Sequence, residues 1–300
     1  MFMTKTSDWL ISFNSSYQRQ VHHLLTERKQ QQDKTTTISI TGGKGGVGKT
    51  SISLKFAKEL AAEGSKVLLI DCDYNLSNTS IKLDLPLTNN FYSLITNEKS
   101  FEECLYQDGN FHLLSACNGN VDMFDREMRM EEFIIDIINE HEGEYDFILL
   151  DCPAGIQRES LTLNAYCDYR VVVVTPDKAS ITDSYSLIKV LSQKFGIKEN
   201  HLLVNKYRTP AQFEKVVSTL SETVENFLGC RTRILGGVKR VDISQNKFDK
   251  YFLDTTGKND LQRNFLKVVG RLTEELGRPI VPTEIFPLEK LNTTFNNLNA

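Results

Sequence analysis

The fold of this chain is decided by the stretch Gly42-Gly43-Lys44-Gly45-Gly46-Val47-Gly48-Lys49-Thr50. An apolar, β-branched run at 37–41 precedes it, and a segment with helical spacing at 51–63 follows it. A strand, a glycine-rich turn and a helix in this order are the context of a phosphate-binding loop. Gly43, Gly48, Lys49 and Thr50 also fill the G-x-x-x-x-G-K-[ST] template of that loop. The stretch therefore predicts a site for a nucleoside triphosphate.

The chemistry of this loop follows from its backbone and from two side chains. Glycines let the chain curl so that successive N–H groups point at a phosphate, and the next helix adds the positive end of its dipole. Lys49 is expected to bridge the β- and γ-phosphates, and the Thr50 hydroxyl is expected to ligate Mg²⁺. The predicted nucleotide-binding residues of the loop are Gly43, Lys44, Gly45, Gly46, Val47, Gly48, Lys49, Thr50 and Ser51.

Length and composition describe one large globular domain. With 300 residues, of which 40% are hydrophobic and 25% charged, the chain can bury a substantial core. Its net charge of −4 gives no general reason to expect nucleic acid as a partner. Six scattered cysteines without a C-x-x-C pair are typical of small buried side chains in a reducing cytosol. No apolar run has the length of a membrane span and the N-terminus lacks the apolar core of a signal peptide, so we expect a cytoplasmic protein.

The chain divides into three predicted parts. Residues 1–36 combine an amphipathic helix with a polar linker, because apolar side chains recur at steps of three and four between Leu10 and Leu24. This helix either packs on the core or docks on a partner. Residues 37–278 form the predicted nucleotide-binding domain, and residues 279–300 form a tail with a short amphipathic stretch.

Apolar, strand-like runs alternate with helical patterns in the predicted domain. Strands that are apolar throughout are typical of a parallel sheet with helices on both faces. The predicted strands after the first are 66–71, 111–116, 147–151, 170–175 and 202–205. The further predicted helices are 122–140, 183–195, 209–227 and 259–276. The alternation predicts an α/β fold, a doubly wound, mostly parallel sheet with helices on both faces and with ligands at the carboxyl ends of its strands.

Carboxylates follow two of these strands. Asp151 ends the run 147–151, as a Walker B aspartate does when it holds Mg²⁺ directly or through water. Asp71 and Asp73 follow the next apolar run after the loop, where a carboxylate could accept a proton from an attacking water. The predicted metal site consists of Thr50, Asp73 and Asp151. Asp71 either takes part or braces the loop.

Lys44 directly precedes Gly-Gly-x-Gly-Lys-Thr, and it resembles the signature lysine of the deviant Walker A motif in the MinD/ParA family of P-loop ATPases. The segment 71–78 similarly resembles the switch I element D-x-D-x-x-L-x-N of the MinD branch. The resemblance implies a homodimer in the ATP-bound state, in which Lys44 reaches the phosphates of the partner's ATP. It also implies catalytic roles for Lys44, Lys49 and Asp73, with Asp73 orienting the attacking water.

Further segments extend the resemblance. Asn205 and Lys206 end a predicted strand where family members use an Asn amide to read adenine, which implies that both residues bind ATP. The segment 175–183 resembles the T-P-E-x-x-S-I-T-D stretch of the flagellar-number regulators, the FlhG or FleN branch. This implies a slowly hydrolysing switch that controls the placement or number of flagella. An FlhF-like GTPase is an implied partner, although residues 17–25 depart from the branch's D-Q-A-x-x-L-R motif.

Two other roles within the family remain alternatives. A MinD-like division-site regulator uses a basic, membrane-binding tail, whereas this tail carries only Lys290 against Glu284 and Glu289. Peripheral binding at the inner face of the cell membrane and docking within the chain are both open for it. A ParA-like DNA-partitioning ATPase is the second alternative, because basic residues outnumber acidic ones between 230 and 271. The acidic balance of the whole chain disfavours nucleic acid as a partner.

Overall fold

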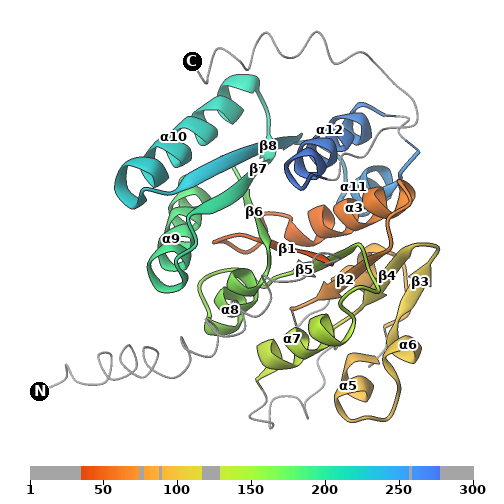
Figure 1. Cartoon of the computed structure of the whole chain (residues 1–300). Coiled ribbons are helices and arrows are strands. Elements are labelled where there is room, and N and C mark those ends of the chain that lie inside the picture. Colours follow the sequence, from red (N-terminus) through yellow and green to blue (C-terminus); the bar gives the residue numbers. More distant parts are fainter. Residues whose placement is uncertain (1–34, 74–77, 88–89, 117–128, 257–258, 278–300) are drawn as a thin grey trace, which may run out of the picture.

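An eight-stranded sheet runs through the part of the chain that the structure describes (Figure 1). This computed structural model describes residues 35–73, 78–87, 90–116, 129–256 and 259–277. The strands are β1 (Thr36–Thr41), β2 (Val67–Asp71), β3 (Tyr106–Asp108), β4 (Phe111–Leu114), β5 (Phe147–Asp151), β6 (Tyr169–Val174), β7 (Glu199–Tyr207) and β8 (Arg231–Lys239). Their order across the sheet is β3-β4-β2-β5-β1-β6-β7-β8. All neighbours run parallel except β3, which pairs antiparallel with β4.

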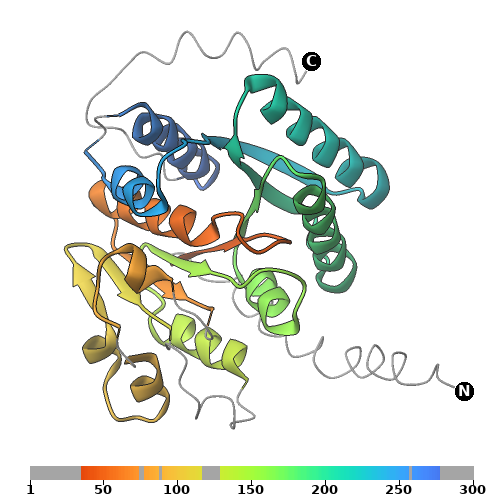
Figure 2. The same ribbon diagram turned by 180° about the vertical axis from the view of Figure 1, so that it is seen from behind.

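Helices connect the parallel strands and cover both faces of the sheet (Figures 1 and 2). They are α3 (Lys49–Ala62), α4 (Thr79–Lys82), α5 (Asn90–Ile95), α6 (Phe101–Cys104), α7 (Met130–Glu140), α8 (Arg158–Tyr166), α9 (Lys178–Phe195), α10 (Pro210–Leu228), α11 (Gln245–Leu253) and α12 (Asp260–Glu275). The predicted α/β class with a doubly wound, mostly parallel sheet is confirmed. Every strand predicted from the sequence has a counterpart among β1, β2, β4, β5, β6 and β7.

Alternate side chains of the central strands β5 and β6 enter different cores, which explains their apolar runs at 147–150 and 171–174. In β5, Leu149 packs on the side of α3, while Ile148 and Leu150 pack on the opposite side against α7. In β6, Val171 and Val172 divide between the two sides in the same way. Neither face of the sheet is left to water, so each position of a central strand favours a β-branched or aliphatic residue.

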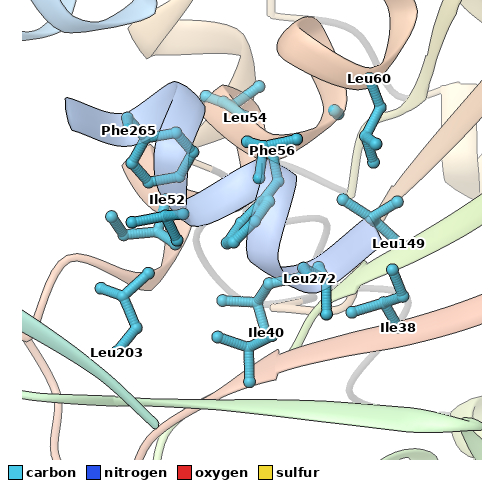
Figure 3. Packing of buried hydrophobic residues seen from close by; sticks show 14 of the residues in the cluster. Ile38, Ile40, Ile52, Leu54, Phe56, Leu60, Leu149, Leu203, Phe265 and Leu272 are labelled. Carbon is cyan, nitrogen blue, oxygen red and sulfur yellow. The ribbon is translucent and has the colours of Figure 1, made fainter. Parts of the chain in front are cut away.

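The core under α3 holds the helix that follows the phosphate loop (Figure 3). Phe56 of α3 meets Phe265 of α12 edge-on, with ring centroids 4.8 Å apart. Both rings are fully buried above Ile38 and Ile40 of β1. The aromatic contact joins the first and last helices of the described domain, so α12 supports the element on which the phosphate loop ends.

Several elements were not predicted, and each has a weak sequence pattern. β8 contains Gly236 and Gly237, which interrupt its apolar alternation, and β3 is a short, exposed edge strand. α8 and α11 are only nine residues long and rich in polar side chains. The predicted helix at 122–140 corresponds to α7 from residue 130 onward, and residues 122–128 lie outside the described residues.

The predicted N-terminal helix, the tail at 279–300 and Cys117 also lie outside the described residues. The other cysteines are free, buried thiols, as expected from their scatter in the sequence. Within the described ranges, no helix is both long enough and apolar enough to cross a membrane.

Candidate functional site

Residues that lie far apart in the sequence meet at the carboxyl edge of the sheet. The phosphate loop, which we define as residues 42–48, connects the end of β1 to the start of α3. β2 and β5 end in Asp71 and Asp151, which face each other in the strand register. Asn205, near the end of β7, donates from Nδ2 to the carbonyl oxygen of Val47 in the loop. The structure thus brings the predicted loop, acidic and amide residues together at one edge.

The phosphate loop fits its surroundings closely at two glycines. Gly48 has a φ of 100°, and a Cβ there would lie 2.5 Å from Nδ2 of Asn205. Gly43 lies against the backbone of α9, where a Cβ would come within 2.3 Å of the carbonyl oxygen of Asp183. Other side chains cannot be accommodated at these positions without moving backbone or a buried amide. The curled loop is therefore held from outside, as a cradle of N–H groups for a phosphate requires.

Asp151 is a buried carboxylate beside a second one. Its side chain accepts a hydrogen bond from Ser53 Oγ at 2.9 Å. Burial and the charge of Asp71 raise the pKa of Asp151 to about 7, although Thr50, Lys49 and Ser53 act in the opposite direction. Two adjacent buried carboxylates near a threonine hydroxyl form an oxygen donor set that suits a divalent cation. Thr50 and Asp151 therefore fit the predicted Mg²⁺ site.

Asp71 braces the segment that carries Asp73. Its Oδ1 accepts from the backbone N–H of Asp73 at 3.1 Å, and its Oδ2 accepts from the Thr79 hydroxyl at 2.7 Å. Asp71 is buried, whereas the side chain of Asp73 is half-buried. Of the two readings that the sequence left open for Asp71, these contacts favour the bracing one. Asp73 lies beside the site, and its contribution as a metal ligand or water-orienting group remains a prediction.

The raised pKa of Asp151 predicts an unusual dependence of stability on pH. Because its folded-state pKa of about 7 lies above the ordinary value of 3.8, ionisation of Asp151 destabilises the metal-free fold progressively between about pH 4 and pH 7. At pH 8 in EDTA, the free energy of unfolding of Asp151→Asn should therefore exceed that of the wild type by roughly 2–4 kcal/mol. The difference should shrink at pH 5, where the wild-type carboxyl holds its proton.

Urea unfolding monitored by circular dichroism at both pH values would measure this effect. Asp108→Asn, a change on the exposed edge strand β3, provides the control. Equal stability of the wild type and Asp151→Asn at pH 8 would contradict a net cost of burying the two adjacent carboxylates.

Lys44 lies on the exposed part of the loop and is paired within its own chain. Its Nζ contacts Asp177 Oδ1 at 2.9 Å, and both side chains are more than 40% exposed. Asp177 also caps α9 by accepting from the N–H of Ser180, and it accepts a hydrogen bond from Thr175 Oγ1 at 2.6 Å. Burial is the largest single influence and raises the pKa of Asp177, but the hydrogen bonds from Thr175, Lys44 and Ser180 and the charge of Lys44 together outweigh it and lower this pKa to about 2. The carboxylate of Asp177 is therefore ionised at every physiological pH.

Asn205 and Lys206 contact the phosphate loop directly. Besides the bond of Asn205 to Val47, Lys206 Nζ donates to the carbonyl oxygen of Gly46 at 2.7 Å. Oδ1 of Asn205 accepts from the backbone N–H of Lys206 at 2.9 Å. Burial lowers the pKa of Lys206, and the nearby charges of Arg240 and Lys82 lower it further. Both residues thus support the loop in this structure, while recognition of adenine by the Asn205 amide remains a prediction.

A cavity of about 290 Å³ opens beside the loop. It lies over the carboxyl ends of β6, β7 and β8 and is bordered by the cations Lys44, Lys206, Arg208 and Arg240. Arg208 and Arg240 share the carboxylate of Asp242, at 3.6 and 3.0 Å respectively. The positive charge around the cavity favours an anionic ligand.

Some residues of this edge were missed in the sequence. Ser53 lies one turn beyond Lys49 on α3, so helical spacing was a usable signal for it. Arg240 and the buried Asp249 had no such signal, because β8 and α11 were not predicted. Arg208 lies just beyond the predicted strand 202–205 and matches no motif. Among the described residues, no group of three or more His, Cys, Asp or Glu side chains could hold a metal ion by itself. The predicted Mg²⁺ site combines two carboxylates with the Thr50 hydroxyl, and phosphate oxygens of a bound nucleotide would supply further ligands.

Comparisons with known proteins agree with this geometry. A family model described as an AAA domain, AAA_31, matches residues 35–202. Antiactivator FleN of Pseudomonas aeruginosa is 28% identical over 200 residues, 66% of this chain and 71% of FleN. The putative septum site-determining protein MinD of Mesostigma viride is 34% identical over 207 residues, 68% of this chain and 71% of that protein. MinD of Pyrococcus horikoshii OT3, whose structure is a complex with Mg-ADP, superposes with a TM-score of 0.65 at 22% identity and covers 81% of this chain and 98% of its own.

The sheet order, the phosphate loop after β1 and the acidic ends of β2 and β5 define a P-loop nucleotide-binding domain. The chain belongs to the AAA_31 family of AAA domains and, with Lys44 ahead of the loop, to the MinD/ParA class of P-loop ATPases. Proteins of that class to which the chain is similar include FleN and several MinD proteins.

Proposed function

We propose that this chain binds ATP and Mg²⁺ at the phosphate loop and hydrolyses ATP slowly, as a switch between a monomer and an ATP-bound homodimer. The observation that carries the proposal is the presence of one lysine in the phosphate loop and of a second directly after it. Lys49 opens α3 at the base of the loop, and Lys44 lies exposed on its outer part. Membership of the MinD/ParA class supports the same conclusion.

Each residue of the site has a role in this proposal. The triphosphate is held by the backbone N–H groups of the loop, together with Lys49 and Ser51. Thr50 and Asp151 would hold Mg²⁺, which neutralises phosphate charge when bound. Asp73 orients the attacking water and accepts its proton. Asn205 and Lys206 hold the loop and contact the base side of the nucleotide.

Lys44 has the role of joining two subunits. Two ATP-loaded faces repel each other unless cations lie between their phosphates. The pair of Lys44 with Asp177 is solvent-exposed, and such ion pairs contribute about 1 kcal/mol or less. Lys44 can therefore exchange the carboxylate of Asp177 for a phosphate across the interface at little cost.

Lys44→Ala should bind ATP as a monomer and fail to dimerise, because its proposed contact lies in the other subunit. Light scattering in a non-hydrolysable ATP analogue would measure this. The wild type should have about twice the monomer mass of 34.2 kDa, and the variant should have the monomer mass. Lys189→Ala, an exposed lysine on α9, is the matched control and should dimerise. If Lys44→Ala formed a normal dimer, Lys44 would have no role in joining the subunits.

We further propose that the output of the switch is control of flagellar placement or number. The 28% identity to FleN and the FlhG-like stretch at 175–183 support this choice. An FlhF-like GTPase or another flagellar protein is then the expected partner, contacted through residues 1–36. The protein would reside in the cytoplasm and visit the inner face of the cell membrane at most peripherally.

A division-site role is the second candidate, because the MinD proteins are similar at up to 34% identity. A ParA-like role in DNA partition has the weaker support of fold similarity, as with a putative plasmid partition protein of Borrelia burgdorferi at 18% identity. Deleting the gene in the organism of origin separates the three candidates. Altered flagellar number or position supports the first, misplaced septa the second and loss of plasmid or chromosome the third.

A further inference from the structure

Asp249 is a buried carboxylate in α11 that joins three separate parts of the domain. It is 5% exposed, and it accepts hydrogen bonds from Ser51 Oγ at 3.0 Å and from Lys82 Nζ at 2.8 Å. Gln245, one turn earlier on α11, donates to it from Nε2 at 3.0 Å. Several donors therefore surround one buried negative charge, and this arrangement requires the elements that carry them to keep fixed positions.

The two partners from outside α11 belong to the two halves of the nucleotide site. Ser51 follows Thr50 in the first turn of α3, so its hydroxyl ties the base of the phosphate loop to Asp249. Lys82 ends α4, and Thr79 at the start of that short helix donates to Asp71. Asp71 in turn holds the backbone N–H of Asp73. A continuous set of hydrogen bonds thus leads from the phosphate loop through Asp249 and α4 to Asp73.

We propose that Asp249 is a positioning residue that sets the place of Asp73 relative to the phosphate loop. The proposal rests on the proposed function in one respect only: the effect expected from misplacing Asp73 is slower ATP hydrolysis. Asp249 touches neither the loop's backbone nor Asp73, and it acts through Ser51 and through Lys82 and α4. Its loss should therefore slow turnover more than it weakens nucleotide binding.

Asp249 can position α4 because its ion pair with Lys82 is buried. The two side chains are 17% and 7% exposed, so the pair is largely shielded from water and salt. Removing one member of such a pair leaves the other charge without its partner in a poorly solvated place. The next residue of α11 offers a contrast, because Lys250 pairs with Asp84 at 3.1 Å while both side chains are more than 70% exposed. That exposed pair joins the same two segments and should contribute little.

Hydrogen exchange of the metal- and nucleotide-free protein tests the positioning directly. Asp249→Asn keeps the size of the side chain and an acceptor for Ser51 but removes the charge that holds Lys82. The amides of Asp73, Lys82 and Leu83 should exchange about tenfold faster in this variant, while the amides of β5 should not change. Lys250→Met is the matched control and should exchange like the wild type. Unchanged exchange at Asp73 and in α4 of Asp249→Asn would overturn the proposal, whether or not the protein hydrolyses ATP.

Kinetics test the consequence for turnover. Asp249→Asn and Lys82→Met should each lower kcat about tenfold and change KM less than about threefold, and the double variant should be no slower than either single one. Equal losses in kcat and in nucleotide affinity, or independent effects that multiply, would also overturn the proposal. Absence of ATP hydrolysis in the wild type would instead refute the proposed function, and the exchange experiment would still decide the role of Asp249.

Discussion

Lys49→Ala is expected to lower the affinity for ATP by at least about 100-fold. Lys49 is the first residue of α3, and its positive charge is felt by the buried Asp151. The residues that border the loop on its outer side, such as Lys44 and Lys206, are tied to Asp177 and to the carbonyl of Gly46. The contact assigned to Lys44 lies in the other subunit, and Lys206 supports the outer side of the loop, so neither residue is placed to replace the charge of Lys49.

Isothermal titration calorimetry with ATP and Mg²⁺ measures this loss. Lys58→Ala, a change on the same helix away from the loop, is the matched control and should bind ATP like the wild type. Circular dichroism establishes that both variants are folded. Wild-type affinity in folded Lys49→Ala would refute the assignment of the loop as the ATP site.

Asp73→Ala is expected to lower ATP turnover by about 100-fold or more, in the range of lost general-base catalysis. ATP binding should persist, because Asp73 lies beyond the phosphate loop and is held by Asp71 through its backbone rather than its side chain. The variant should therefore accumulate as an ATP-bound dimer, whereas the wild type returns to monomer as ATP is consumed.

A phosphate-release assay measures the turnover of Asp73→Ala, with Asp108→Ala on the edge strand β3 as the control of equal charge change. Nucleotide affinity, measured separately, distinguishes slow chemistry from weak binding. Hydrolysis at the wild-type rate would assign Asp73 a structural role only.

The elements that the sequence predicted are those whose local pattern matches their final environment. β5 and β6 contain uninterrupted apolar runs, at 147–150 and 171–174, because both faces of the sheet are covered there, and such a run is recognisable from four residues. β8 escaped prediction because Gly236 and Gly237 occupy its centre. A Cβ at Gly237 would lie 2.5 Å from the carbonyl oxygen of Val204, so the close approach of β7 requires glycine at this position. The same glycine weakens the strand pattern in the sequence.

The site was predictable to the extent that its residues follow strands or fill the loop template. Lys49, Thr50, Asp71 and Asp151 are of this kind, and the structure gathers them at one edge. Contacts between distant segments were not predictable. Ser51 and Asp249 are 198 residues apart in the sequence, and the bond between them depends on how α11 packs on α3. The contact of Asn205 with Val47 is of the same kind, and no local pattern announces it.

The central claim is that ATP controls the association of this chain. Light scattering of the wild type during a single addition of ATP and Mg²⁺ tests it most directly. We predict a mass near 34.2 kDa in ADP, a rise to about twice that value after ATP is added, and a return as phosphate is released. A mass that stays constant through the addition and consumption of ATP would contradict the account.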